Sequence, residues 1–163
     1  MTRSALNVLY VDNHLIAVHK PAGLLTQTDL SADESLVDQT RQWVKKEYNK
    51  PGDIFLGLVH RLDRNVSGVV LFARTSKAAS RLSKQFRERI PKKHYKAIVI
   101  GKLKEERATL VNYLRKEKSL KATVFPRETP FSKHSKLSYE VIDSLEKNSL
   151  VEVTLSTGRF HQI

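Results

Sequence analysis

Short apolar runs joined by tight turns constrain the fold of this chain more than any other feature. Residues 6–11 and 14–19 are two such runs, and only Asp12 and Asn13 separate them. Both residue types tolerate the positive φ angles that two-residue hairpin turns require. Residues 137–156 repeat the arrangement with a longer turn. Strands joined in this way pair antiparallel, so the sequence predicts an antiparallel sheet.

Two segments have the spacing of amphipathic helices instead. In residues 35–48 apolar side chains recur every three or four positions, Asp33 or Ser35 can cap the start, and a Lys-Pro-Gly sequence follows. A second helix is predicted over residues 75–90. Its expected buried stripe consists of Ala78, Ala79, Leu82, Phe86 and Ile90. The fold class is therefore α+β, a mixed, mostly antiparallel sheet flanked by helices.

The other segments are predicted less sharply. Residues 69–73 and 94–101 are apolar enough for strands. Residues 109–123 have weak periodicity and many cations, which favours an extended and partly mobile segment. No repeat, low-complexity stretch or linker divides the chain, so we expect residues 1–163 to form a single domain.

The net charge of +12 indicates a polyanionic partner. Residues 74–107 contain twelve lysines and arginines but only three acids. A solvated helix face followed by a basic loop is the simpler interpretation of such a run. The surplus is not balanced by acids four positions away, however, so a groove that follows phosphates explains it better. The charge favours nucleic acid, with an acidic membrane surface as the competing partner.

The sequence lacks the motifs that mark several kinds of site and several classes of protein. The chain has no cysteine and its six histidines are dispersed, so neither disulfides nor a metal site is expected. It has no run of about 18 apolar residues and no apolar signal core at its N-terminus. Gly52 and Gly57 have the spacing of a P-loop, but Leu58 and Val59 follow in place of Lys-Ser/Thr. We expect a cytoplasmic protein without a nucleotide cofactor.

A charged cluster stands directly before the predicted strand at residues 69–73. It consists of His60, Arg61, Asp63 and Arg64. The simpler interpretation is a salt bridge that satisfies a loop. The alternative is a functional carboxylate, because loops on a rigid scaffold present reactive groups. A neighbouring arginine would keep Asp63 ionised, as a nucleophile or general base requires.

Four motifs together resemble the RluA-type pseudouridine synthase family, and the resemblance runs from about residue 6 to residue 163. The motifs are Lys20-Pro-Ala-Gly-Leu-Leu25, His60-Arg-Leu-Asp63 followed by Ser67-Gly68, Lys93-His-Tyr95-Lys-Ala97, and Thr157-Gly-Arg159-Phe-His-Gln-Ile163. The resemblance implies the pseudouridine synthase catalytic fold. It also implies isomerisation of specific uridines to pseudouridine in structured ribosomal or transfer RNA, without metal or cofactor.

The same resemblance implies roles for single residues that would otherwise be a half-buried aromatic or a surface cation. Asp63 is the essential catalytic acid. Tyr95 stacks on the flipped uracil and can also act in proton transfer. Arg159 pairs with Asp63 and keeps it charged and aimed.

For the remaining predicted site residues, the resemblance implies contacts with RNA. Arg61 occupies the gap that the flipped nucleotide leaves, and Ile163 packs against the uracil ring. The set is completed by His60, Arg64 and Lys93.

Two departures from the family pattern shape the expectations. The family's catalytic domain continues past the last motif, so we expect this chain to be C-terminally incomplete. We also expect no accessory RNA-binding domain before residue 6, so RNA recognition by a monomer would fall to the catalytic domain itself.

Three functions remain open from the sequence. The leading one is an RNA pseudouridine synthase. The second is a catalytically inactive RNA-binding or ribosome-assembly factor that keeps the fold, and the third is a basic structural domain without specific chemistry. Four motifs in the family's order favour the first.

Overall fold

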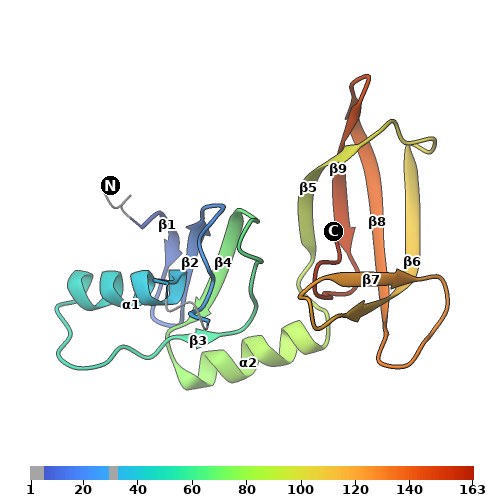
Figure 1. The fold of residues 1–163 in the computed structure, drawn as a ribbon. Coiled ribbons are helices and arrows are strands. Elements are labelled where there is room, and N and C mark those ends of the chain that lie inside the picture. Colours follow the sequence, from blue (N-terminus) through green and yellow to red (C-terminus); the bar gives the residue numbers. More distant parts are fainter. Residues whose placement is uncertain (1–5, 30–32) are drawn as a thin grey trace. The chain divides into compact units, whose positions relative to one another are not determined.

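The computed structural model describes residues 6–29 and 33–163 and divides the chain into two compact units. The units are Met1–Glu88 and Arg89–Ile163. Each contains its own antiparallel sheet, and both helices belong to the first unit (Figure 1). The predicted α+β class is confirmed. Residues 1–5, where no signal core was expected, and residues 30–32 of a polar loop lie outside the described part.

The first unit is built on a four-stranded sheet in the order β1-β2-β4-β3. Its strands are β1 (Val8–Val11), β2 (Leu15–Lys20), β3 (Gly57–Leu58) and β4 (Gly68–Ala73). The predicted N-terminal hairpin is confirmed as β1 and β2. Asp12 closes its turn, because its Oδ1 accepts hydrogen bonds of 2.7 Å from the amides of His14 and Leu15.

Helix α1 (Leu36–Glu47) covers this sheet with its apolar side. Its residues Leu36, Val37 and Val44 are buried in one cluster with side chains of β2 and β4. Of the two predicted caps, Ser35 is the one used. Its hydroxyl accepts from the amide of Asp38, and the Asp38 carboxylate accepts from the amide of Ser35 at 3.1 Å. This reciprocal pair satisfies two backbone donors that the first turn leaves open.

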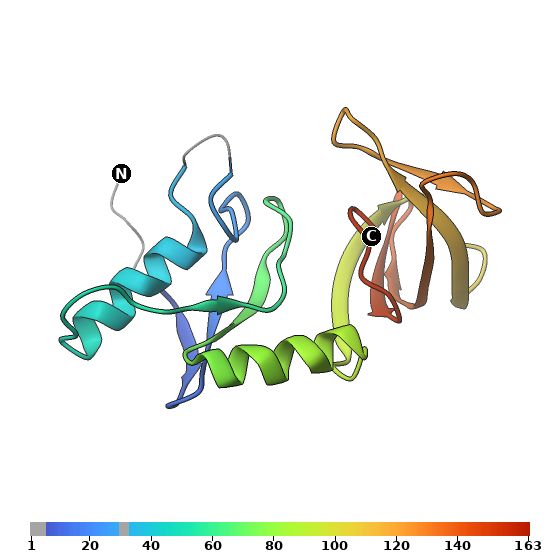
Figure 2. The same cartoon turned by 90° about the horizontal axis from the view of Figure 1, so that it is seen from below.

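Helix α2 (Ser76–Arg87) follows directly from β4 and begins at the Thr75 cap (Figure 2). It ends three residues before the predicted end, because Arg89 adopts a φ of 61° and Pro91 follows. The prediction that α2 has a fully buried stripe is wrong, because these residues are less buried than expected. Its four helical members are half-buried, and Ile90, beyond the helix, is 60% exposed.

Small residues let α2 approach the sheet closely. A Cβ atom added to Gly57 on β3 would lie 2.7 Å from the Cβ of Ala79 and 3.3 Å from that of Ala73. Real Cβ atoms do not approach this closely, so the glycine sets the spacing between helix and strand.

The second unit is a five-stranded sheet in the order β5-β9-β8-β6-β7. Its strands are β5 (Lys93–Ile100), β6 (Arg107–Lys116), β7 (Ala122–Phe125), β8 (Lys133–Ser144) and β9 (Asn148–Leu155). The predicted C-terminal hairpin is confirmed as β8 and β9. Leu137, Val151 and Val153 form the centre of its core.

The segment at residues 109–123 is extended, as predicted, but it is regular strand for most of its length. It forms most of β6 and the start of β7, which pair at four positions from Tyr113↔Phe125 to Lys116↔Ala122. β6 is mostly exposed or half-buried, with Leu114 as its buried residue. Without a buried face it shows little apolar alternation, which accounts for its weak signal in the sequence.

Candidate functional site

The loop that carries Asp63 connects β3 to β4 and is fastened on both sides of this residue. Asp63 itself is half-buried. Before it, the Thr26 hydroxyl donates to the Leu62 carbonyl at 2.7 Å and accepts from the Leu62 amide at 3.2 Å. After it, the Gly23 amide donates to the Arg64 carbonyl at 2.8 Å. The loop after β2 therefore fixes the backbone around the predicted catalytic carboxylate.

Lys20 reinforces this attachment from inside the unit. Its side chain is fully buried. Its Nζ donates hydrogen bonds to the carbonyls of Pro21 at 3.1 Å, Leu24 at 2.6 Å and Arg64 at 3.0 Å. Burial lowers the pKa of Lys20, and the negative charge of Asp63 acts in the opposite direction. A cation from its own unit thus interacts electrostatically with Asp63.

Lys20 is not among the predicted site residues, although the sequence contains a signal for its burial. Ile16 and Val18 alternate along β2 on the buried face, and Lys20 is the next residue of that alternation. A lysine that continues a buried face must have its ammonium satisfied by hydrogen bonds.

Two of the predicted RNA-binding residues in this loop also have structural contacts. The Arg64 guanidinium donates to the Gly23 carbonyl at 3.0 Å and pairs with Asp33 at 3.0 Å. The His60 Nε2 accepts from the Leu71 amide at 2.9 Å, and its ring stacks on Phe86 with 4.8 Å between centroids. Both residues join the loop to neighbouring elements. Arg61 is exposed.

In the second unit, β5 carries two predicted residues near its start. Tyr95 pairs with Val153 of β9 and packs, half-buried, against the core of this sheet. Lys93 is also half-buried, and its Nζ lies 3.3 Å from the position a Cβ of Gly158 would take. Burial, with the nearby charge of Arg89 as a further cause, lowers the pKa of Lys93. Lys93 therefore lies beside the turn that carries Arg159.

The turn at residues 157–163 is held by the side chains of its own motif. The Gln162 Oε1 accepts from the Thr157 hydroxyl at 3.0 Å and from the Arg159 amide at 2.9 Å. The Arg159 Nε donates to the His134 carbonyl at 2.8 Å, which orients the guanidinium against β8. The spacing of the motif therefore allows Gln162 to reach both Thr157 and Arg159 and to close the turn. Ile163 is 54% exposed.

The predicted site residues fall into two groups. One group lies on the β3–β4 loop of the first unit: His60, Arg61, Asp63 and Arg64. The other lies on the second unit: Lys93, Tyr95, Arg159 and Ile163. An ion pair between Asp63 and Arg159, with Tyr95 beside it, would join the two units. Both features stay predictions.

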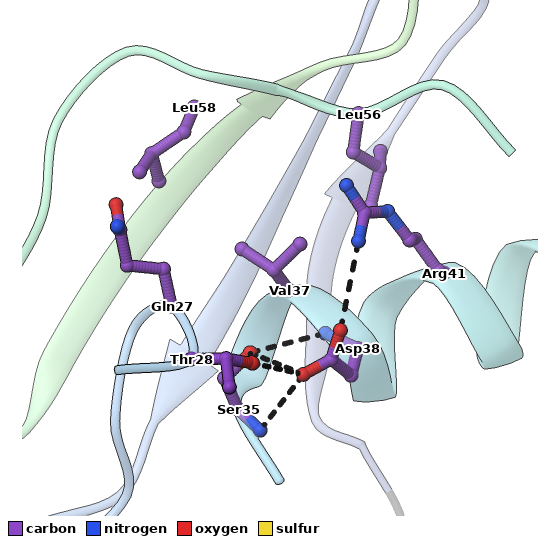
Figure 3. A pocket seen from close by; sticks show the side chains of 8 residues that line it. All are labelled: Gln27, Thr28, Ser35, Val37, Asp38, Arg41, Leu56 and Leu58. Carbon is purple, nitrogen blue, oxygen red and sulfur yellow. Dashed lines mark hydrogen bonds and ion pairs between the residues drawn. The ribbon is translucent and has the colours of Figure 1, made fainter. Parts of the chain in front are cut away.

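The first unit also has a hollow of about 260 Å³, and none of these residues lines it. It is lined by Gln27, Thr28, Ser35, Val37, Asp38, Arg41, Leu56 and Leu58 (Figure 3). Its Asp38 carboxylate accepts from the Thr28 hydroxyl and the Ser35 hydroxyl and amide, and it pairs with Arg41. These polar groups serve the cap of α1, so we assign the hollow a structural role.

The described residues contain neither a metal-ligand cluster nor a membrane-spanning helix. Within residues 6–29 and 33–163, no three histidine, aspartate or glutamate side chains gather as metal ligands would. In the same part of the chain, neither helix has the length and apolar character needed to cross a bilayer.

Residues 14–163 match the family model of the RNA pseudouridylate synthases. Because this match covers most of the chain, the chain belongs to that family. The family identified by resemblance from four motifs is thereby confirmed.

Relatives of known name agree with this membership. The chain is 35% identical over 161 residues to the "Dual-specificity RNA pseudouridine synthase RluA" of Haemophilus influenzae, a match that covers 97% of the chain and 69% of the relative. It is 31% identical over 156 residues to the "Ribosomal large subunit pseudouridine synthase C" of Buchnera aphidicola, covering 96% of the chain and 48% of the relative. The chain thus spans about half the length of several of the curated relatives it matches.

A solved structure shares the fold. "Human RNA Pseudouridylate Synthase Domain Containing 4" superposes with a TM-score of 0.79 at 24% identity, over 96% of this chain and 61% of the human one. At this identity the likeness is one of fold alone.

Proposed function

We propose that the protein isomerises specific uridines to pseudouridine in structured ribosomal or transfer RNA. The observation that carries this proposal is the attachment of the Asp63 loop. Membership of the family names the reaction, and the hydrogen bonds on both sides of Asp63 give it the fixed position that a reacting carboxylate needs.

In the proposed reaction, Asp63 acts on a uridine that has been flipped out of the RNA. The glycosidic bond from N1 breaks, the uracil rotates, and carbon 5 bonds to the ribose in its place. Carbon 5 then loses its proton and N1 gains one, so the atoms balance. The product is an isomer of the substrate, so no co-substrate is consumed, and the family resemblance implies neither a metal nor a cofactor. Flipping a base out costs a few kcal/mol, and phosphate contacts of the basic segment at residues 74–107 would offset this.

The roles of the other residues belong to the same proposal. Arg159 pairs with Asp63, and Tyr95 stacks on the uracil with Ile163 against the ring. Arg61 enters the gap in the RNA, and its exposure supports this role. Further RNA contacts come from His60, Arg64 and Lys93. Since the predicted residues come from both units, we infer that the units act as one catalytic domain, in a cytoplasmic monomer.

The test compares the complete protein with its Asp63→Asn variant on uridine-containing RNA, with pseudouridine mapped and RNA affinity measured. The variant is expected to lose at least about 100-fold in rate, within the range for a lost acid–base group, while it binds RNA as before. Asp53→Asn, which changes an exposed aspartate of the same unit, is the matched control.

Two outcomes would contradict the proposal. Product formation by Asp63→Asn at the wild-type rate would remove the role of Asp63. RNA binding by the wild-type protein without any pseudouridine would favour the non-catalytic RNA-binding factor.

A further inference from the structure

Charge is distributed unevenly along the second unit. Its strands run between two ends, and Figure 1 shows β7 at one of them. Lysines and arginines predominate here, in the part we call the basic end. They are Lys93, Arg115, Lys116, Lys118, Lys121, Arg127, Lys133, Lys136 and Arg159, and the acids among them are Glu117 and Glu128.

The opposite end, formed by the turns after β5 and β8, has a balanced charge. Its cations are Lys102, Lys104, Arg107 and Lys147, and its acids are Glu105, Glu106, Glu140, Asp143 and Glu146. Only one end of the sheet therefore has the charge that suits a polyanion.

Phe131 is the most exposed aromatic side chain of the basic end, at 90%. It lies in the connection between β7 and β8, in a four-residue turn from Thr129 to Ser132. The Ser132 amide donates to the Thr129 carbonyl at 3.0 Å, and the Ser132 hydroxyl accepts from the Thr129 amide at 2.9 Å. Phe131 is thus held on an ordered turn.

The backbone at Phe131 is unfavourable for this residue type. Its φ of 65° follows Pro130, as at the third position of a type II turn, where glycine or asparagine is preferred. A bulky side chain at positive φ is strained. Neither packing, since the ring is 90% exposed, nor backbone preference accounts for a phenylalanine here.

Other aromatic rings of the basic end are already in contact with cations. The Arg115 guanidinium lies 4.8 Å from the centre of the Phe125 ring, and Lys116 Nζ lies 4.7 Å from that of Phe160. The Phe160 ring also stacks on His161 at 3.8 Å. Phe131, by contrast, presents its ring to solvent between two cations of the sequence, Arg127 and Lys133.

We propose that Phe131 stacks on an unpaired base of the RNA, while Arg127 and Lys133 contact the phosphates beside it. This inference rests on the proposed function, because it takes RNA as the partner. An aromatic platform within a basic surface is the common way in which proteins hold single-stranded nucleic acid. The turn supplies the rigidity that such a platform needs.

The experiment measures the affinity of a fluorescein-labelled single-stranded RNA for the protein at several salt concentrations. Base stacking on an aromatic ring is worth about 1–3 kcal/mol, so Phe131→Ala should weaken binding roughly 5- to 150-fold. Its salt dependence should stay unchanged, because no charge is removed. Lys133→Ala should weaken binding and reduce the slope of log affinity against log salt by about one phosphate contact.

A second variant separates stacking from folding. Phe131→Trp keeps a stacking ring, so it should bind as wild type, and in a Trp43→Phe background its fluorescence should be quenched by RNA. Ile100→Ala is the matched control, because Ile100 is 94% exposed at the opposite end of the sheet, and it should leave affinity unchanged.

Two results would overturn the inference. If wild-type protein binds RNA and Phe131→Ala binds it equally, or Phe131→Trp is not quenched, the stacking contact fails while the proposed function stands. If the wild-type protein binds no RNA even at low salt, both fail.

Discussion

The ammonium of Lys20 donates a 3.0 Å hydrogen bond to the carbonyl of Arg64, the residue that follows Asp63. The two residues are 44 positions apart in the chain. Through this contact, a side chain at the end of β2 helps to position the loop that carries the predicted catalytic carboxylate. The contact lies inside the first unit, so it holds the loop independently of Arg159.

Replacing Lys20 by methionine should therefore affect both stability and activity. Lys20→Met leaves buried carbonyls without their donor, and a buried group left unsatisfied costs about 1–3 kcal/mol. We expect the free energy of unfolding, measured with urea, to fall by about this amount. The rate of pseudouridine formation should fall as well, and by more than RNA affinity does, because Lys20 is fully buried and acts only through the loop that it holds.

The control for this variant is Lys50→Met, at an exposed lysine after α1. It removes the same charge and should change the unfolding free energy by less than about 0.5 kcal/mol. If Lys20→Met matched this control in stability and rate, the positioning role of Lys20 would be disproved.

Gly57 should not tolerate even one added methyl group. The Cβ of a Gly57→Ala variant would lie 2.7 Å from the Cβ of Ala79, so α2 or β3 must shift. Overpacking of this kind costs about 1–3 kcal/mol. Adding Ala79→Gly to the variant should restore part of the loss when thermal unfolding is followed by circular dichroism. The same stability for Gly57→Ala and wild type would show that the helix is free to move.

Asp38 should make the first unit sensitive to acid. The hydrogen bond from the Ser35 hydroxyl is the largest cause that lowers the pKa of Asp38, and those from Thr28 and the Ser35 amide act in the same direction. Because the folded-state pKa lies below the ordinary value of 3.8, the stabilisation is present above that value and is lost as pH falls through the folded-state pKa.

The measurement is urea unfolding between about pH 6 and pH 2, the region in which such a carboxylate is titrated. Asp38→Asn should be less stable than wild type at the upper end and lose less stability on acidification. Thr28→Val removes one of the three hydrogen bonds and should give an intermediate result. An unchanged acid dependence in Asp38→Asn would contradict the assignment.

Local patterns predicted most of the secondary structure. The hairpin turn at Asp12 and the cap at Ser35 involve residues a few positions apart, so the sequence contains the whole interaction. The end of α2 was predicted too late, because the left-handed conformation of Arg89 has no signal at a non-glycine residue. Strand β6 gave a weak signal because it buries little of its surface.

The residues of the candidate site could be proposed from the sequence, but most of the contacts that hold them in place could not. Asp63 was found from its neighbours and from the motif that contains it. The contribution of Lys20 depends on carbonyl oxygens of Leu24 and Arg64, and backbone carbonyls are the same in every sequence. The sequence does show that Lys20 continues the alternation of Ile16 and Val18. This alternation predicts that the lysine is buried, but it does not predict which groups the lysine binds.

The attachment of the Asp63 loop also has a consequence for the order of folding. The hydrogen bonds from Thr26 to Leu62 and from Lys20 to Arg64 close loops of about forty residues. Contacts so distant in sequence form only after the entropy of closing the loop has been offset, here by the pairing of β2 with β4 along six positions. We therefore expect the Asp63 carboxylate to reach its final position late, once β2 and β4 have paired, so that a partly folded chain would not yet hold it in place.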